Sequence, residues 1–388
     1  MTTVFLNPGR EKRLAGGHLW IYDNEIRIVE GHVDPGDVVD VRTADRSFIG
    51  RGHINPRSTI AVRLLTRQRE TIDEAFFRRR LEEAVALRRK LVGAATAYRV
   101  VYSEGDGLPG LIVDRNDDLL VMQTLTLGMA RHEGPLVRLL QELLQPAAIY
   151  VRNDAPVRRR EGLPLEARFA SGESPLVQDI EEHGVRFQVD VAAGQKTGFF
   201  LDQRENRAAV AAYAHGDVLD VFYYTGGFAM HAARAGARVT GIDISPEAVA
   251  AAVRHARLNG VESRCTFQTA NAFDALRAMA RQAPRFDLVV LDPPAFAPSR
   301  ADVNKAAAGY KEINLRAIKV MRPGGILASC SCSYHIDEGL LIDIVAQAAY
   351  DARRRIRLLE ARTQARDHPI HPGMPETRYL KCLILEVS

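Results

Sequence analysis

From about Asp217 onward, short apolar segments alternate with segments of helical periodicity, and this alternation constrains the fold more than any other feature of the chain. The expected strands cover residues 218–222, 239–243, 265–268, 287–292 and 326–330, and the expected helices cover 229–235 and 246–259. Short apolar strands that alternate with helices are typical of a doubly wound parallel sheet. The sequence therefore predicts an α/β sheet in the last part of the chain.

The residues before this sheet follow two other patterns. The first seventy or so are β-rich, with expected strands at 38–41, 48–52 and 60–64. Helical periodicity then begins near Phe77, and it is followed by a hairpin at 108–125, a helix at 129–144, a strand at 148–152 and a second hairpin around 181–184. We therefore expect a small β-rich domain at 1–70, a central α+β domain at 71–178 and the α/β domain at 179–388.

Composition narrows the function classes. The chain has 388 residues, a net charge of +4 and no apolar run of the roughly twenty residues that cross a bilayer, so no membrane span is expected. The first residues lack the pattern of a signal peptide, which makes the cytoplasm the expected location. Four cysteines are too few and too unevenly placed for a disulfide framework, and no zinc motif is complete, so no metal is expected.

Arginine is locally dense. Four basic clusters lie at 78–80, 88–90, 158–160 and 353–355. Each cluster taken alone is typical of a solvated helix face balanced by glutamates. Three of them lie before the expected α/β sheet, and together they favour a polyanionic partner.

The ends of the expected strands carry the candidate chemistry, because ligands of an open parallel sheet bind beyond the carboxyl ends of its strands. The first strand ends at Asp220, before a loop with the glycine pair Gly226-Gly227 that lets a ligand approach the backbone. This loop has neither the dinucleotide fingerprint nor a phosphate loop. The second strand ends at Asp243, which can accept hydrogen bonds from ribose hydroxyls, since Ser245 already supplies a helix cap. The combination suits S-adenosylmethionine better than NAD.

The later strands end in two further motifs. Asp292-Pro293-Pro294 follows the fourth strand, and two prolines form a rigid wall that can orient a planar base. Ser329-Cys330-Ser331-Cys332-Ser333 follows the fifth. A thiol at the mouth of such a sheet is either a small buried hydrophobe or a nucleophile, and both readings apply to each cysteine at this point.

Taken together, these motifs resemble the class I S-adenosylmethionine-dependent methyltransferases, which have a Rossmann-like sheet. More closely, they are similar to the bacterial large-subunit ribosomal RNA cytosine-C5 methyltransferases of the RlmI group. The matching stretches, in order, are 194–207, 220–228, 241–243, 292–294, 331–333, 367–369 and 379–381. The first part is similar as well, because that family begins with a PUA RNA-binding domain followed by a mixed α/β linking domain.

The resemblance implies a function and a site. The function is the S-adenosylmethionine-dependent formation of 5-methylcytosine in 23S ribosomal RNA through a covalent bond from a cysteine to C6 of the base. Cys332 stands at the position of the catalytic cysteine, Cys330 at that of a residue that is no nucleophile, and Asp292 lies near the methionine end of the cofactor and the target base. The cofactor-binding residues implied are Gln203, Asp220, Tyr224, Thr225, Gly226, Phe228, Asp243, Asn271 and Asp292.

The RNA is expected to meet two further groups of residues. Pro293 and Pro294 would contact the target base, while Arg10, Lys12 and Arg13 are candidates for phosphate contacts. Trp20 could stack on a base, although a lone tryptophan is more often part of a core. The expected partners are thus ribosomal RNA and, as an open alternative, a second copy of the chain.

Two departures from the family pattern matter. An acid is usual near Asn271, where it accepts a hydrogen bond from the adenine amino group; an asparagine still offers an acceptor. Many RNA cytosine-C5 methyltransferases place a second cysteine directly after the proline of the fourth-strand motif, whereas this chain has Pro294 and Ala295 there. The base that removes the C5 proton is therefore unassigned.

Two alternatives stay open. Asp-Pro-Pro-Ala-Phe at 292–296 is one residue off the motif of enzymes that methylate amines, so methylation of a base nitrogen without a covalent adduct is one. A non-catalytic RNA-binding assembly factor, in which the basic clusters and first domain carry the function, is the other.

Overall fold

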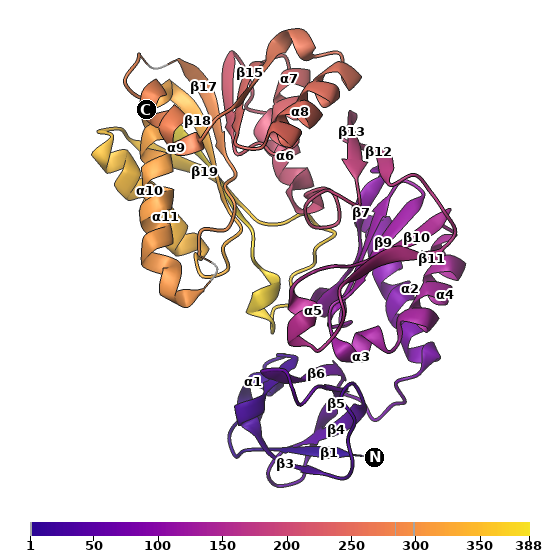
Figure 1. The fold of residues 1–388 in the computed structure, drawn as a ribbon. Helices are drawn as coiled ribbons and strands as arrows, with labels where there is room; N and C mark the ends of the chain where they lie inside the picture. The colour runs from indigo at the N-terminus through magenta and orange to yellow at the C-terminus, as the bar shows by residue number, and fades with distance from the viewer. Residues whose placement is uncertain (1, 284, 298) are drawn as a thin grey trace. The chain divides into compact units, whose positions relative to one another are not determined.

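The computed structural model describes residues 2–283, 285–297 and 299–388 (Figure 1). It divides into two compact units. The first consists of 1–180, 189–201 and 366–377, and the second of 181–188, 202–365 and 378–388. Segments 181–188 and 202–365 thus interrupt the first unit, and the chain returns to that unit after each of them. No helix in the described part of the chain is both long and apolar enough to span a membrane.

A six-stranded sheet forms the beginning of the first unit, with the order β2-β6-β5-β4-β1-β3. Its strands are β1 (Thr3–Leu6), β2 (Trp20–Tyr22), β3 (Ile26–Glu30), β4 (Val38–Arg42), β5 (Phe48–Ile54) and β6 (Ile60–Thr66). β1 runs parallel to β4, and the other pairings are antiparallel. The short helix α1 (Glu11–Ala15) and the turn η1 (Asp23–Glu25) complete it. The predicted strands at 38–41, 48–52 and 60–64 are confirmed.

The rest of the first unit is built on a five-stranded sheet with the order β11-β10-β9-β8-β7. Its strands are β7 (Ala97–Tyr102), β8 (Leu111–Asn116), β9 (Leu119–Thr124), β10 (Ala148–Asn153) and β11 (Glu166–Ser171). Its helices are α2 (Glu74–Leu91), α3 (Leu127–Ala130), α4 (Glu133–Leu144) and α5 (Val157–Arg160), with η2 (Ser103–Asp106). Phe77, Leu81 and Ala84 bury the predicted face of α2, which packs against β7 and α4.

The prediction of one helix over 129–144 is wrong, because the segment forms α3 and α4 with a break at Arg131 and His132. Pro135 explains the break. It stands in the first turn of α4, where its missing N–H is not needed, whereas a continuous helix would lose a hydrogen bond there. His132 precedes α4 and stacks on His53 of the six-stranded sheet, with 5.2 Å between ring centroids.

The second predicted hairpin is present as β12 (Val177–Glu182) and β13 (Val185–Asp190). Its side chains alternate strictly between buried and exposed, as expected for strands with one covered face. Its tip, residues 181–188, belongs to the second unit.

A seven-stranded sheet with the order β16-β15-β14-β17-β18-β20-β19 forms the second unit. Its strands are β14 (Asp217–Val221), β15 (Arg238–Asp243), β16 (Cys265–Thr269), β17 (Phe286–Leu291), β18 (Met321–Ser331), β19 (Ile356–Arg362) and β20 (Lys381–Val387). The first five strands of the order just given are parallel, as predicted, whereas β20 runs antiparallel to both of its neighbours. Strand order thus reverses between β14 and β17, which places the expected ligand site at their carboxyl ends.

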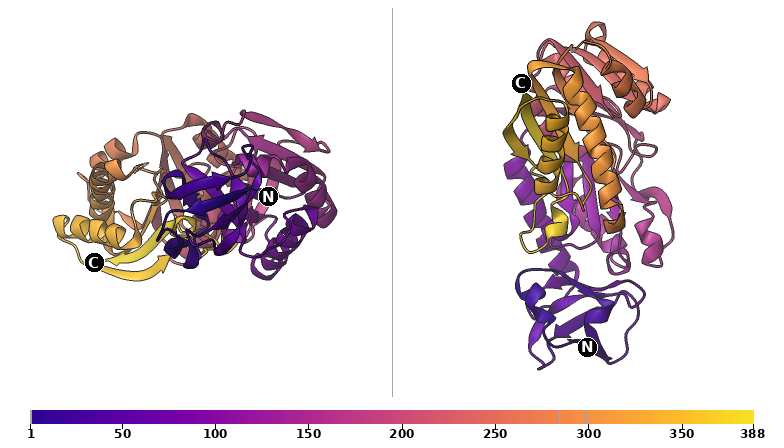
Figure 2. Two further views of the ribbon diagram at one scale, coloured as in Figure 1. Left: turned by 90° about the horizontal axis from the view of Figure 1, so that it is seen from below. Right: turned by 90° about the vertical axis from the view of Figure 1, so that its left-hand side faces the viewer.

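Helices cover both faces of this sheet (Figures 1 and 2). On one face lie α6 (Arg204–Ala211), α7 (Gly227–Arg234) and α8 (Pro246–Leu258), and on the other lie α9 (Ala272–Met279), α10 (Val303–Val320) and α11 (Glu338–Asp351). Short turns η3 (Leu201–Gln203), η4 (Glu262–Arg264), η5 (Arg300–Asp302) and η6 (Pro375–Thr377) connect other segments. The doubly wound α/β fold is therefore confirmed.

Candidate active site

Four predicted site residues stand at the carboxyl ends of neighbouring strands of the second unit. Asp243 ends β15, Asp220 lies in β14 and Asp292 directly follows β17. Leu291 pairs with Ser329 of β18, so Cys332 stands just beyond the end of that strand. Three carboxylates and one thiol are thereby brought to one edge of the sheet.

The loop between β14 and α7 is held in an unusual backbone conformation. Phe222, Tyr224 and Gly226 have φ values of 64°, 53° and 86°, in the left-handed region that is unfavourable for residues other than glycine. A Cβ atom on Gly226 would lie 3.2 Å from the Cβ of Ala252 in α8. The loop is therefore packed tightly against α8 at the carboxyl end of β14.

Asp220 is the most unusual charge of this site. Its side chain is fully buried, and neither carboxylate oxygen receives a hydrogen bond of standard geometry from the described residues. Burial, and then the nearby charges of Asp292 and Asp243, raise its pKa well above the usual value. The buried hydroxyl of Thr225 likewise has no hydrogen-bond partner among the described residues. Unsatisfied buried polar atoms fit a polar ligand that completes them.

Asp243 and Asn271 have partners in the protein. The Asp243 carboxylate accepts hydrogen bonds from the backbone N–H of Tyr224 (2.9 Å) and of Ser245 (3.0 Å), so it joins the glycine loop to the start of α8. Asn271 caps α9, and its side-chain oxygen accepts from the N–H of Phe273 (3.0 Å) and of Asp274 (3.3 Å). The acceptor expected for an adenine amino group therefore already serves as a helix cap.

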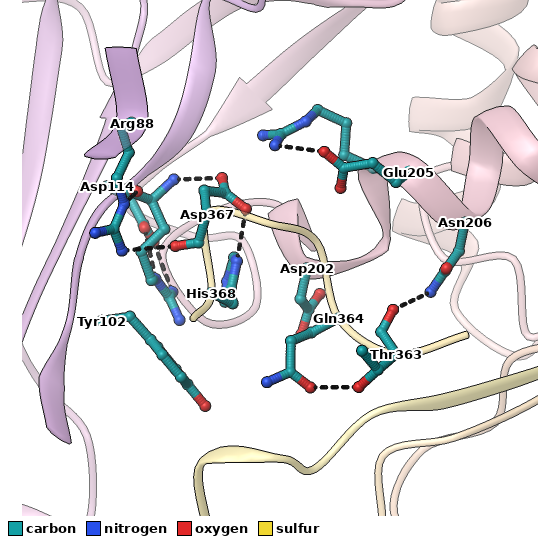
Figure 3. Close-up of polar contacts among 12 residues, drawn as sticks. Arg88, Tyr102, Asp114, Asp202, Glu205, Asn206, Thr363, Gln364, Asp367 and His368 are labelled. Carbon is teal, nitrogen blue, oxygen red and sulfur yellow. Dashed lines mark hydrogen bonds and ion pairs between the residues drawn. The ribbon is translucent and has the colours of Figure 1, made fainter. Parts of the chain in front are cut away.

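Asp292 is oriented by an amide. The Gln203 side chain is buried and donates to an Asp292 oxygen at 3.0 Å, while its own oxygen accepts from Asn206 at 2.7 Å. Asn206 also donates to the carbonyl oxygen of Thr363 at 3.1 Å, as Figure 3 shows. The predicted cofactor ligand Gln203 thus holds a predicted catalytic residue. Of the prolines that follow, Pro293 is buried and Pro294 is exposed.

The two cysteines of the Ser-Cys-Ser-Cys-Ser motif have different surroundings. Cys330 is fully buried opposite Cys382 of β20, and this thiol contact followed by burial raises the pKa of Cys330 well above its usual value. Cys332 is partly exposed. Cys330 therefore has the environment of a packing residue, and Cys332 is the one of the pair that a substrate can reach.

Hydroxyl groups fix the residues on both sides of Cys332. The Ser331 hydroxyl donates to the Tyr310 hydroxyl at 3.0 Å, and the Ser333 hydroxyl lies 3.1 Å from the same Tyr310 oxygen. The backbone N–H of Ala297 also donates to the Ser333 hydroxyl, at 3.3 Å. The serines of the motif thus tie Cys332 to α10 and to the segment that follows Asp292-Pro293-Pro294.

An aromatic cluster lies beside these residues. Phe222, Phe273 and Phe296 have ring centroids 6.1–6.5 Å apart, and Phe296 lies 4.8 Å from Tyr310. The three phenylalanines are only partly buried, so they present apolar ring surface at the same end of the sheet. Aromatic surface of this kind suits a planar heterocycle.

In the first unit, two of the basic clusters contain an arginine with a structural role. Arg88 is buried, and its guanidinium donates to both oxygens of Asp106. It also donates to the carbonyl oxygen of Asp367 at 2.7 Å (Figure 3). Arg158 is buried as well and donates to the backbone carbonyl of Pro164 at 3.0 Å. These two side chains stabilise the fold. The other basic residues of the clusters at 88–90 and 158–160 are exposed.

The candidate phosphate contacts in the six-stranded sheet also differ from one another. Arg10 and Lys12 are exposed. Arg13 donates to Glu25 at 2.7 Å and to the carbonyl oxygen of Trp20 at 3.1 Å, so its charge is already paired within the domain. The Trp20 ring nitrogen donates to Glu104 at 2.8 Å.

Two family models match the chain. A PUA-like domain model matches residues 4–67, and a model described as S-adenosylmethionine-dependent methyltransferase matches residues 153–374, which is more than half of the chain. A solved structure whose title assigns it to the S-adenosylmethionine-dependent methyltransferases, from Streptococcus mutans, has the same fold, with a TM-score of 0.85, 18% identity and full coverage of both chains. Another, of a methyltransferase complexed with SAH, has a TM-score of 0.86 at 18% identity over all of both chains.

The fold, the strand-end residues and these matches define the class: the chain belongs to the S-adenosylmethionine-dependent methyltransferases, and S-adenosylmethionine is its cofactor. Curated proteins named ribosomal RNA large subunit methyltransferase I match over full length. The one from Alteromonas mediterranea is 40% identical over 99% of this chain and 98% of its own, and that from Pseudoalteromonas atlantica is 42% identical over 99% of both. The chain belongs to this family. The expected resemblance and the PUA-like domain are confirmed.

Two residues of this site had no predicted role. Tyr310 lies in α10, where its spacing suggests only a core position, and the serine contacts appear only in three dimensions. Lys381 lies in the Tyr-Leu-Lys stretch of the family resemblance, and its signal was a charged residue at the start of an otherwise apolar strand.

Proposed function

We propose that this protein forms 5-methylcytosine in large-subunit ribosomal RNA through a covalent bond between Cys332 and C6 of the target base. Its relatives' name supports the substrate class. The observation that carries the covalent part is the placement of Cys332: a partly exposed thiol at the end of β18, between two serines that are anchored to Tyr310, and one strand away from Asp292.

Each residue then has a task. Bound S-adenosylmethionine supplies the electrophilic methyl group that C5 takes up. Asp220, Thr225 and the glycine loop bind the cofactor, because their buried polar atoms require partners. The Cys332 thiolate adds to C6, and the electron pair of the C5–C6 double bond moves to C5, which makes C5 nucleophilic. Asp292, held by Gln203, hydrogen-bonds the ring and stabilises the adduct.

The reaction ends with elimination. The C5 proton passes to water, the electron pair of the C–H bond restores the double bond, and the C6–S bond breaks to return the thiolate. No second cysteine follows Pro294, so this scheme requires one thiol only. A base within a helix has to be flipped out to reach the strand ends.

A fluorinated substrate tests the proposal. RNA that contains 5-fluorocytidine cannot lose a proton from C5, so the covalent adduct should accumulate as a complex that resists denaturing electrophoresis. The Cys332→Ala variant should give no complex and no methyl transfer, whereas Cys330→Ala should give both. A fully active Cys332→Ala variant would refute the covalent mechanism and favour methylation of a base nitrogen.

RNA binding by the PUA-like domain is part of the same proposal. We expect Arg10 and Lys12, both exposed, to contact phosphates, and Arg13 to contribute less because Glu25 neutralises it. The Arg10→Gln/Lys12→Gln variant should lower RNA affinity and flatten its dependence on salt concentration by roughly one to two units of the logarithmic slope. An unchanged slope in fluorescence titrations would remove this domain face from the RNA interface. A cytoplasmic location and a homodimer stay predictions, which fractionation and light scattering measure.

A further inference from the structure

Lys381 is a buried cation beside the catalytic segment. It begins β20, where it pairs in register with Ser331 of β18, and only 4% of its surface is exposed. Its ammonium group donates to the carbonyl oxygen of Ser333 at 2.7 Å and to that of Tyr379 at 2.8 Å. A buried ammonium with neutral partners is unfavourable, because desolvation is only partly offset by carbonyl oxygens.

Cys332 lies in the sequence between Ser331 and Ser333, and Lys381 contacts both of these serines. Strand pairing fixes Ser331 against the backbone of Lys381, and the ammonium group fixes the carbonyl oxygen of Ser333. The serine hydroxyls are meanwhile held by Tyr310 from α10. The three-residue segment 331–333 is therefore clamped by the backbone and ammonium group of Lys381 and by the hydroxyl of Tyr310.

The charges around this segment come from several elements. Burial lowers the pKa of Lys381 to about 8, while the charges of Cys332 and then of Asp337 act in the opposite direction and that of Arg378 lowers it further. Burial raises the pKa of Tyr310, so its phenol stays protonated. Asp292 contributes negative charge from the end of β17. Lys381 is thus the buried cation that a thiolate at position 332 would stabilise, and a thiolate would in turn stabilise the ammonium group.

We propose that Lys381 is a positioning residue that holds segment 331–333 in place and shifts the ionisation of Cys332 toward the thiolate. The inference rests on the proposed covalent function. In this step the thiol releases its proton to water, and the thiolate remains beside the ammonium group. When the C6–S bond breaks, the Lys381 ammonium group stabilises the thiolate that forms again.

Alkylation of Cys332 without RNA or cofactor tests the charge effect. The rate of its reaction with iodoacetamide, followed by mass spectrometry of the peptide that contains it, reports the thiolate fraction at each pH. In Lys381→Met the midpoint of this profile should move up by about one pH unit, which is about a tenfold slower reaction near neutral pH. The peptide that contains Cys265 provides an internal control. Cys265 begins β16, the edge strand on the side of the sheet away from β20 and Lys381, so its alkylation rate should not change.

Two further variants separate charge from position. Lys381→Gln keeps a hydrogen-bond donor without the charge, and Lys381→Arg keeps the charge. If the charge matters, Lys381→Gln should resemble Lys381→Met and Lys381→Arg should resemble the wild type. If Lys381→Gln restores the wild-type profile, the role is mechanical and the ionisation part of the inference is overturned. Unchanged profiles in all three variants would overturn all of it.

The inference and the proposed function can fail separately. S-adenosylmethionine binding measured by calorimetry shows whether each variant is folded, and Asp337→Asn, which removes the next charge near Lys381, should shift the Cys332 profile less and in the opposite direction. A shifted profile together with a fully active Cys332→Ala variant would leave Lys381 as a neighbour of an unused thiol. An unshifted profile with an inactive Cys332→Ala variant would retain the nucleophile and reject the role of Lys381.

Discussion

Glu182 and Asp220 are both buried carboxylates of the second unit, and their surroundings differ in opposite ways. Glu182, at the tip of the β12–β13 hairpin, receives two hydrogen bonds from Arg207 (2.5 and 2.8 Å) and one from His231 (2.9 Å). Although burial alone would raise its pKa, the Arg207 charge and these hydrogen bonds lower it to about 2. Asp220, at the carboxyl end of β14, receives no such hydrogen bonds from the described residues. Burial and the charges of Asp292 and Asp243 outweigh the charge of Arg207, so the pKa of Asp220 is raised. A buried charge that has its partners within the protein is tolerated only while those partners are present, whereas a buried charge left unsatisfied marks the place of a ligand.

The largest expected effect comes from removing the cation at Glu182. Arg207→Met leaves a buried carboxylate with a single histidine partner, and we expect the free energy of unfolding to fall by about 3–5 kcal/mol. Denaturant titration of the cofactor-free protein measures it. The double variant Glu182→Gln/Arg207→Met removes both charges and should recover a large part of the loss. If the single and double variants are equally destabilised, Arg207 acts by packing rather than by charge.

At Asp220 the effect should appear in binding instead. Asp220→Asn keeps the shape but removes the charge, and we expect the affinity for S-adenosylmethionine to fall about 10- to 100-fold, because hydrogen bonds to charged groups contribute about 1.5–3 kcal/mol. Calorimetry measures this change. Asp217→Asn, at the other end of the same strand and partly exposed, is the matched control and should leave affinity unchanged. Equal affinities for all three proteins would mean that Asp220 faces no ligand.

Asp220 should also affect stability with a pH dependence opposite to that of Glu182, because the pKa of Asp220 is raised and that of Glu182 is lowered. The pKa of Asp220 is higher in the folded than in the unfolded protein, so its ionisation destabilises the fold. This penalty is absent below the unfolded pKa, near 3.8, grows as the pH rises toward the folded pKa and is complete above it. Without cofactor, Asp220→Asn should therefore be more stable than the wild type at neutral pH, and the difference should vanish near pH 4, as denaturant titrations at both pH values would show. A difference that grows on acidification would contradict this environment of Asp220.

The sequence alone predicts the place of Asp220 better than the pairing of Glu182 with Arg207. Asp220, Asp243, Asp292 and Cys332 are predictable because parallel strands bring their carboxyl ends together whatever the details of packing. The Glu182–Arg207 pair joins a hairpin to α6, and the Gln203–Asp292 contact spans 89 positions. Such contacts depend on how separate elements dock, which no local pattern specifies.

Strand direction shows the same limit. β19 and β20 were not predicted, since β19 is largely exposed and its residues lack a clear apolar alternation. β20 inserts antiparallel between β18 and β19 and so brings Lys381 opposite Ser331. A lysine at the start of an apolar strand is visible in the sequence, but its place opposite Ser331 follows only from that register.

The smallest expected effect comes from Gln203. Asp292 is intermediate between Glu182 and Asp220, because its hydrogen-bond donor is the neutral amide of Gln203. Gln203→Leu should lower kcat about tenfold, about 1.4 kcal/mol, through a less well oriented carboxylate, and should change the affinity for S-adenosylmethionine less. Asn206→Ala, which removes the donor to the Gln203 oxygen, should produce a weaker form of the same defect. Single-turnover methyl transfer separates the rate from binding. If Gln203→Leu weakens cofactor binding and leaves kcat intact, Gln203 is a cofactor ligand like Asp220, and Asp292 does not depend on it.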